Sequence, residues 1–269
     1  MAVGQSVQVS QTLADGWAVQ RRVIFALLMH EVLTRFGRHN IGFLWMFVEP
    51  MVFTLFVAGL WTVSGMLHIS NLPIFAFAIT GYTNVLLWRN STNRMMNSVE
   101  PNAALMYHRY VKYLDVLVAR GLLEVSGVFV AFIFLVVAFW MVGLSGLPED
   151  PMKVLLALVL LAWFGLSLGL LIGSVSERGE LIEKVWHPLS YIMFPLSGAA
   201  FLVESLPTST QDFALWLPMV HGVEMLRDGY FGSAFRARYD VGYLLFWNLV
   251  LTFIGLLQVR VVAKGIHTG

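Results

Sequence analysis

The sequence predicts an all-α integral membrane protein with six transmembrane helices. Hydrophobic residues make up 58% of its 269 residues and charged residues 12%, and the mean hydropathy is +0.74, whereas a soluble domain carries about 25% charged residues. A helix needs roughly 20 apolar residues to cross the bilayer core. Segments that meet or approach this length are 42–64, 72–87, 113–143, 154–176, 185–203 and 241–259.

The first forty residues, 1–40, predict an amphipathic helix that lies in the membrane interface, with a frayed cytoplasmic tail as the alternative. Apolar residues recur on one helical stripe, and Arg22 points away from it. The stripe consists of Leu13, Trp17, Ile24, Leu27 and Leu28. No signal peptide is visible, so the first span is expected to direct insertion. Residues 41–269 form the six-span part, and without a repeat or linker the chain 1–269 is a single transmembrane domain.

A basic stub runs without a spacer into the first span. It carries Arg35, Arg38 and His39, and basic residues beside a span mark its cytoplasmic end. Inside the span, Glu49 is followed by Pro50, which removes a backbone hydrogen bond. We expect a kink here, with Glu49 in a structural ion pair or, alternatively, facing a pore.

The connection 89–115 after the second span is long for a membrane protein and predicts a short cytoplasmic helix. Glu100 and Pro101 would begin that helix, and Tyr107 would lie near its end. Such a polar projection suits a soluble partner protein. The alternative is a solvated loop whose arginines only follow the positive-inside rule.

The third and fourth spans contain two simple patterns. Arg120 and Glu124 are four residues apart on one helix and predict a local salt bridge. Gly165, Gly169 and Gly173 recur every four residues, a small-residue ridge that lets another helix approach closely.

The fifth span contains Pro188 and Pro195 and is therefore expected to be bent or broken. The following stretch, 201–232, is too polar to span twice and too apolar for a free loop. It predicts a pair of short re-entrant helices that face the outside, next to a translocation path.

The distribution of lysine and arginine predicts that both termini are cytoplasmic. On a six-span path, thirteen of these residues fall on the inner side and four on the outer side, as the positive-inside rule requires. The inner ones are Arg21, Arg22, Arg35, Arg38, Arg89, Arg94, Arg109, Lys112, Arg120, Arg178, Lys184, Arg260 and Lys264, and the outer ones are Lys153, Arg227, Arg236 and Arg238.

Basic side chains near the inner leaflet are candidates for binding an anionic glycolipid. Arg38 and His39 precede the first span, and Arg89 and Arg94 follow the second. Arginine recognises phosphate and carboxylate groups in a bidentate manner. The alternative is that these residues only anchor the orientation of the chain.

Aromatic residues make up 14% of the chain and include candidates for a path along which sugars slide. The more common role of Trp and Tyr at span ends is an interface belt. The candidates are Trp45, Trp61, Tyr82, Trp88, Tyr191, Trp216 and Tyr230.

Several catalytic motifs do not occur in the sequence. There is no GxxxxGK[ST] phosphate loop and no GxSxG nucleophile elbow, and HEVLT at His30 lacks the second histidine of a zinc protease. The absence of cysteine excludes disulfides and thiolate sites, and a net charge of +1 disfavours nucleic-acid binding. We expect no cofactor or metal in this chain. A membrane enzyme acting on lipid-linked sugars stays as an alternative, with Glu100, His108 and Arg109 as candidates.

Four segments carry a resemblance to a known family. They are TRFGRHNIGFLWMFVEP, EPNAALMYHRYVKYLD, SERGELIEKVWHPLSYIMFPLSGAAF and LPMVHGVEMLRDGYFG. With them, nearly the whole chain resembles the permease subunit of ABC exporters of the second type, in particular the capsular polysaccharide and O-antigen permeases. Many relatives have Asn-Pro where this chain has Leu217 and Pro218, a small departure.

The resemblance implies a function and a set of partners. It implies a homodimer in the bacterial inner membrane, with two separate ATPase subunits that bind ATP and Mg²⁺ and with periplasmic and outer-membrane export components. Between the two copies a lipid-linked acidic capsular polysaccharide would be extruded. A permease of the same fold for O-antigen, a drug or another lipid is the nearer alternative.

The resemblance also assigns roles to residues of this chain. The stub with Arg35 and Arg38 corresponds to a gating and coupling segment near the substrate entrance. The helix predicted from Glu100 and Pro101 to Tyr107 resembles the coupling helix that sits in a groove of the ATPase. The stretch 206–227 corresponds to re-entrant helices that cap the pore.

Overall fold

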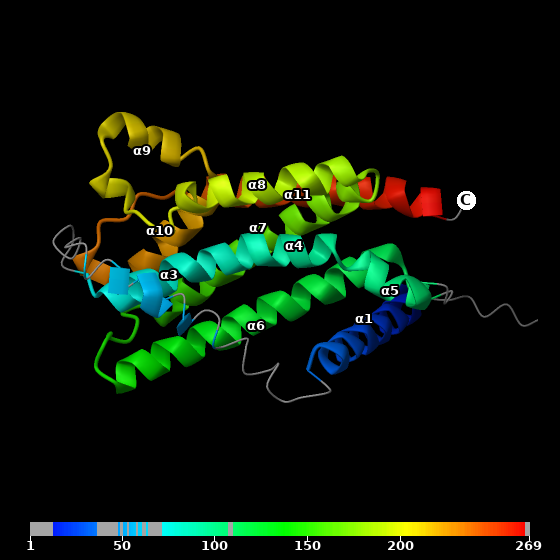
Figure 1. Ribbon diagram of the computed structural model, residues 1–269, viewed down its shortest axis with the longest axis horizontal. Coiled ribbons are helices and arrows are strands. Elements are labelled where there is room, and N and C mark those ends of the chain that lie inside the picture. Colours follow the sequence, from blue (N-terminus) through cyan, green and yellow to red (C-terminus); the bar gives the residue numbers. More distant parts are fainter. Residues whose placement is uncertain are drawn as a thin grey trace, which may run out of the picture.

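The computed structural model describes residues 13–36, 48, 51–52, 54–57, 59–60, 63, 72–106 and 110–266. These residues form helices and connections without a strand, which confirms the all-α fold (Figure 1). The helices are α1 (Leu13–Phe36), α3 (Ile74–Val85), η2 (Leu86–Asn90), α4 (Ser91–Met96), α5 (Val99–Met106), α6 (Tyr113–Met141), α7 (Pro151–Ser176), α8 (Glu180–Leu196), η3 (Val203–Ser205), α9 (Thr208–Ala214), α10 (Pro218–Phe231), η4 (Gly232–Ala234) and α11 (Val241–Ile266).

Within the described residues, three helices are long and apolar enough to cross a membrane. They are α6, α7 and most of α11, which coincide with the third, fourth and sixth predicted spans. At 29 residues, α6 is about 44 Å long. α7 begins three residues before its predicted start because Asp150 caps it, accepting a hydrogen bond from the Lys153 amide at 3.0 Å, and Pro151 occupies the first turn.

The second predicted span continues well beyond its predicted end at Leu87. α3, the π-helical turn η2 and α4 follow one another without a break, so a helix runs from Ile74 to Met96. At 1.5 Å per residue it is about 34 Å long, enough to cross the bilayer core. Arg89 and Arg94 therefore lie within this helix and not in the loop below it.

The fifth predicted span is shifted towards the N-terminus. α8 begins at Glu180, includes Pro188, and ends at Leu196 directly after Pro195. Gly198 follows with a φ of +80°, a backbone conformation that glycine adopts without strain. The break predicted from the prolines thus occurs at the C-terminal end of the helix.

Two helices, α9 and α10, lie within the stretch 201–232, whereas their re-entrant position in the membrane stays a prediction. α9 and α10 lie at one end of the molecule, with the connection between α6 and α7 (Figure 1). α5, the C-terminal end of α11 and the connection between α7 and α8 lie towards the opposite end. α7 packs against α4, α6, α8, α10 and α11 and is the centre of the bundle.

The glycine ridge of α7 packs against the long helix from α3 to α4. A Cβ at Gly165 would overlap the carbonyl oxygen of Leu87, and one at Gly169 would overlap the sulfur of Met95. At Gly173 a Cβ would lie 3.3 Å from a methyl group of Leu117. The predicted ridge is confirmed, because the two backbones approach closely only where side chains are absent.

Replacing Gly165 with alanine is expected to lower the melting temperature of the purified protein. The added methyl group meets backbone and not a movable side chain, and such overpacking costs about 1–3 kcal/mol. Gly16→Ala is the matched control, since nothing lies within 4 Å of a Cβ there. Thermal unfolding in detergent measures both variants, and equal melting temperatures would contradict close packing at Gly165.

α1 lies beside the first half of α6 (Figure 1). The middle of the predicted stripe packs on protein: Leu27 is buried against Val116 and Ala119 of α6, and Ile24 and Leu28 pack around them. Trp17 of the same stripe is exposed, as are Phe25, Met29 and Leu33, which lie outside the stripe. The stripe expected to face lipid is thus used in part for packing. Most of the predicted first span, including Glu49 and Pro50, lies outside the described residues.

Candidate functional site

α5 presents one face to solvent and anchors the other. Glu100, Pro101, Ala103 and Ala104 are exposed, whereas Asn102 is 2% exposed. The Asn102 amide donates hydrogen bonds to the Ser98 carbonyl at 2.8 Å and to a carboxylate of α1 at 2.7 Å. A short helix held by one buried amide has a defined orientation while its outer face stays free.

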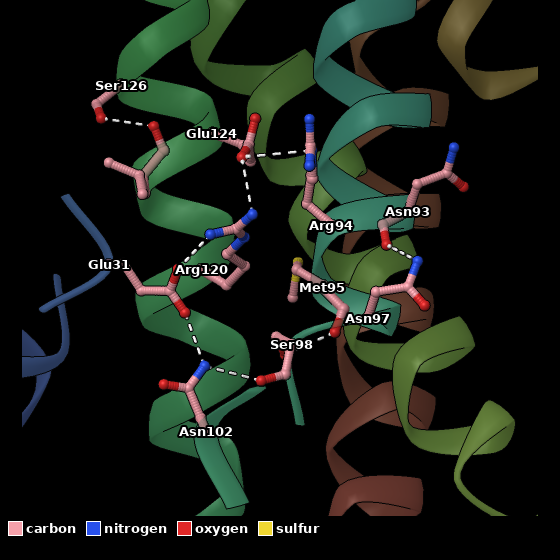
Figure 2. A network of polar contacts seen from close by, with 11 residues as sticks. Glu31, Asn93, Arg94, Met95, Asn97, Ser98, Asn102, Arg120, Glu124 and Ser126 are labelled. Carbon is pink, nitrogen blue, oxygen red and sulfur yellow. Dashed lines mark hydrogen bonds and ion pairs between the residues drawn. The ribbon is translucent and has the colours of Figure 1, made fainter. Parts of the chain in front are cut away.

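The carboxylate that Asn102 contacts belongs to Glu31, the centre of a buried polar network (Figure 2). Glu31 is 8% exposed and forms an ion pair with Arg120 of α6. Its two oxygens therefore have different partners, one on α5 and one on α6. Charged groups in such a buried position are stable when they are paired and hydrogen-bonded.

The network continues from α6 to α4. Arg120 lies 3.8 Å from Glu124, which in turn lies 3.8 Å from Arg94. The predicted pair of Arg120 and Glu124 is present, but it is one link of a longer chain of contacts. The Arg94 side chain is 49% exposed, and exposed ion pairs contribute about 0–1 kcal/mol. The contact between Glu31 and Arg120 is the stronger link because both side chains are nearly buried.

The network connects four helices at the end of the molecule that carries α5. Glu31 is on α1, Asn102 on α5, Arg120 and Glu124 on α6, and Arg94 on α4 (Figure 2). A displacement of α5 must either move its partners or break buried polar contacts, which costs several kcal/mol. The arrangement can therefore transmit a movement of α5 to helices of membrane length.

Of the four predicted basic residues, the structure describes Arg89 and Arg94 and places their side chains in different environments. Arg94 belongs to the network, whereas the guanidinium of Arg89 lies over the ring of Tyr191 on α8, 3.9 Å from its centroid. Arg38 and His39 lie outside the described residues, and the helix α1 includes the backbone of Arg35 but not a described side chain. Convergence of the four predicted basic residues stays a prediction.

The predicted aromatic residues also differ in exposure. Trp88 is 1% exposed and packs edge-to-face against Trp186, so it belongs to the core. Tyr191 is 62% and Trp216 71% exposed, and Tyr82 is partly buried. Trp45, Trp61 and Tyr107 lie outside the described residues.

The opposite end of the molecule is organised by polar side chains of α10. Arg227 is fully buried, and its two terminal nitrogens donate to the carbonyl oxygens of Phe201 at 2.7 Å and Ala199 at 3.0 Å. The guanidinium carbon also lies 3.9 Å from the ring centroid of Phe77 on α3. Arg227 thus satisfies the non-helical backbone that follows α8, as buried irregular backbone requires.

Glu224 and His221 precede Arg227 by one and two turns of α10. Their side chains form hydrogen bonds to backbone groups outside this helix. Glu224 accepts hydrogen bonds from the amides of Val203 and Arg238. Burial lowers the pKa of His221, so its ring is neutral near pH 7. Because Nδ1 accepts from the Asp240 amide at 2.9 Å, Nε2 carries the proton and donates to the Leu215 carbonyl at 2.7 Å.

Comparison with known proteins identifies the family. The model of the family described as ABC-2 type transporter matches residues 22–231. The chain belongs to the ABC-2 type transporter family. The match begins within α1 and ends at the last residue of α10, so it includes both the network and the α10 cluster.

Curated relatives of this ABC-2 transporter chain are similar over almost their whole length. The capsule polysaccharide export inner-membrane protein CtrC of Neisseria meningitidis serogroup B is 45% identical, covering 94% of this chain and 96% of the relative. The protein of the same description named BexB, from Haemophilus influenzae, is 42% identical, with 95% and 97% covered. The polysialic acid transport protein KpsM of Escherichia coli is 28% identical, with 91% and 95% covered.

Sequence reasoning did not identify Glu31 or Asn102 as part of the buried polar network. A signal was present for Glu31, which continues the helical spacing of Ile24, Leu27 and Leu28. A carboxylate on an apolar face of a helix needs a buried partner. For Asn102, neither its spacing nor its neighbours distinguish it from other polar residues of the 89–115 connection.

Proposed function

We propose that this chain is the membrane permease of an ABC exporter that moves lipid-linked capsular polysaccharide across the bacterial inner membrane. Two independent observations support the proposal. The relatives described as capsule polysaccharide export inner-membrane proteins are 42% and 45% identical over nearly complete chains. α5 is exposed on one face and is linked to α1 and, through Glu31, to α6 on the other. This geometry suits docking of a partner protein that supplies the energy for export.

The proposed mechanism depends on the exposed face of α5. A separate ATPase subunit, which binds ATP and Mg²⁺, would seat Glu100, Pro101 and the two adjacent alanines in a groove. When ATP binding closes the ATPase pair, α5 would move, and Asn102, Glu31 and Arg120 would pass the movement to α1 and α6. Hydrolysis would then reset the arrangement. No step of this cycle requires a catalytic residue in the permease.

The proposed membrane topology has six spans with both termini in the cytoplasm. α6, α7 and α11 supply three spans by length and composition, the helix from α3 to α4 and the shorter α8 supply two, and 42–64 supplies the first. The end with α5 then faces the cytoplasm, and α9 and α10 dip into the membrane from the outside as a cap. α1, with Phe25 and Leu33 exposed, would lie in the inner interface.

The proposed assembly contains two copies of the chain and two ATPases, together with periplasmic and outer-membrane components. The channel would lie between the two copies and take an acidic glycolipid from the inner leaflet. Arg38 and His39 near that leaflet suit such a cargo, and so does Arg89, which lies deeper in the bundle. Tyr82, Tyr191 and Trp216 stay candidates for the sugar path.

Replacing Ala104 with tryptophan is expected to reduce binding of the ATPase at least about tenfold, because a bulky ring on the exposed face of α5 prevents close docking. The affinity-tagged chain is coexpressed with the ATPase encoded beside its gene, and the bound ATPase and ATP hydrolysis are quantified after purification. Ala26→Trp, on an exposed face of α1, is the matched control. If the wild-type chain binds no ATPase, the proposed function is wrong; normal binding by Ala104→Trp would exclude α5 as the docking element.

A further inference from the structure

Arg89 lies at membrane depth and not at the cytoplasmic end of its helix. It is in the π-helical turn η2, and Leu87 and Trp88 in that turn face Gly165, near the middle of α7. A Cβ at Gly165 would be 3.1 Å from the Cα of Trp88. Because α7 is long and apolar enough to cross a membrane, the neighbouring Arg89 is level with the membrane interior.

The Arg89 guanidinium lacks the partners that the other arginines of the membrane-length helices have. Arg94 and Arg120 form ion pairs with carboxylates, whereas among the described residues no carboxylate lies within ion-pair distance of Arg89. Its Nε is buried and has no hydrogen-bond partner there. Among the described residues, its guanidinium lies over the ring of Tyr191. Most buried donors in proteins have an acceptor, so the Nε of Arg89 is open to one, as is the Nε1 of Trp88 in the same turn.

The acidic groups of α8 do not fill this role. Glu183 precedes Tyr191 by eight residues, which corresponds to about 12 Å along the helix. It lies 3.6 Å from the His187 imidazole, one turn closer to Tyr191. Among the described residues, the positive charge of Arg89 therefore has no carboxylate partner on α8.

The local backbone adds a second indication of function. Among the described residues, a π-helical turn occurs here, between α3 and α4, and such turns are frequently found at functional sites. Trp88 in this turn is buried in the core, while the adjacent Arg89 reaches towards α8, whose Tyr191 is 62% exposed. The guanidinium is thus held at the edge of the packed core, next to an open aromatic face.

From these contacts we propose that Arg89, held over Tyr191, binds one phosphate or carboxylate group of the exported molecule within the membrane. An ionisable residue at this depth is costly and is usually kept for binding or transport. Guanidinium offers five donors in a planar fork that matches both anions, and the aromatic ring stabilises the cation from one face. The inference rests on the proposed function, because it takes the anion to be part of the cargo.

A binding experiment tests the site directly. The full-length chain is placed in nanodiscs of neutral phosphatidylcholine, and binding of radiolabelled dodecyl phosphate is measured at equilibrium. Arg89→Gln is expected to weaken binding at least about tenfold, the usual effect of losing a charge-assisted hydrogen bond. Arg89→Lys is expected to retain part of the affinity. Arg260→Gln, an exposed arginine on α11, is the control and is expected to bind as the wild type does.

Additional binding measurements distinguish between the possible sources of the bound anion. Labelled dodecanoate tests a carboxylate, and unlabelled dodecyl maltoside tests whether the alkyl chain alone displaces the probe. Added phosphatidylglycerol that displaces the probe would assign the site to a bulk lipid headgroup and overturn the assignment to cargo. If Arg89→Gln does not fold, as judged by its thermal unfolding, Tyr191→Leu replaces it, with an expected three- to tenfold loss.

Surface polysaccharide is measured with the same variants, so that the anion site at Arg89 and the export function are tested independently. If Arg89→Gln binds dodecyl phosphate with wild-type affinity and has normal surface polymer, the proposed anion site is wrong, whereas the proposed export function is unaffected. Loss of ATPase binding by the wild-type chain would overturn the export function, whereas the affinity for dodecyl phosphate would still report on the site.

Discussion

Replacing Arg120 with methionine is expected to abolish export and to destabilise the protein. The change leaves the carboxylates of Glu31 and Glu124, with side chains only 11% and 9% exposed, without their shared cation. Removing one partner of a buried ion pair costs about 3–5 kcal/mol. Surface polysaccharide in a complemented deletion strain and the melting temperature of the purified chain measure the two effects.

Two further variants separate the role of the network from general damage. Arg94→Met removes a half-exposed cation of the same network and is expected to cost less than about 1 kcal/mol. Combining Glu31→Arg with Arg120→Glu reverses the pair and is expected to recover part of the stability and export lost in either single variant. The account of the network fails if Arg120→Met behaves as Arg94→Met does, or if reversal recovers nothing.

Replacing Arg227 with methionine is expected to disrupt the α10 end of the molecule. Two backbone carbonyls after α8 would lose their donor, and each buried group left unsatisfied costs about 1–3 kcal/mol. Burial lowers the pKa of Arg227 to about 10, which still leaves the side chain charged at pH 7, so Glu224 would also lose its compensating charge. The expected loss is about 3 kcal/mol, measured by thermal unfolding, together with loss of export.

Lys153→Met is the matched control for Arg227→Met. Lys153 also lies at this end and pairs with Asp228 of α10 at 3.1 Å, but its side chain is 34% exposed. Exposed pairs contribute about 0–1 kcal/mol, so the melting temperature should change little. Similar losses in both variants would show that burial of Arg227 does not determine its role.

The helices that sequence reasoning predicted well are those whose apolar stretch is interrupted by few charges. α6, α7 and α11 have long uncharged runs, and their apolar length defines them without tertiary information. The small-residue ridge of α7 was also predictable, because the spacing of its glycines leaves one face of a helix open.

Helix ends within polar sequence were less predictable. Arg89 and Arg94 end the apolar window at Leu87, yet the helix continues to Met96, with Arg94 paired with Glu124 of α6 and the Arg89 guanidinium over the Tyr191 ring of α8. Propensity and hydropathy do not contain such tertiary contacts. In α8, proline and glycine marked the C-terminal end correctly, whereas its N-terminal end begins with charged residues that a hydropathy window rejects.

The network itself could not be predicted from one sequence. Glu31 and Arg120 are 89 residues apart, and their contact depends on how α1 crosses α6. The pattern indicated only that Arg120 would pair with Glu124, four residues away. A contact between residues so far apart cannot be recognised from their spacing in the sequence, whereas a pair four residues apart on one helix can.

The location of the polysaccharide in a strain that lacks this gene tests the central claim most directly. If the chain is the export permease, the polymer is still synthesised, accumulates inside the cell and disappears from the surface. Wild-type chain restores the surface polymer, and Arg120→Met does not. Polymer that stays on the surface, or a loss of synthesis without internal accumulation, would contradict the account, and the second result would indicate a membrane enzyme.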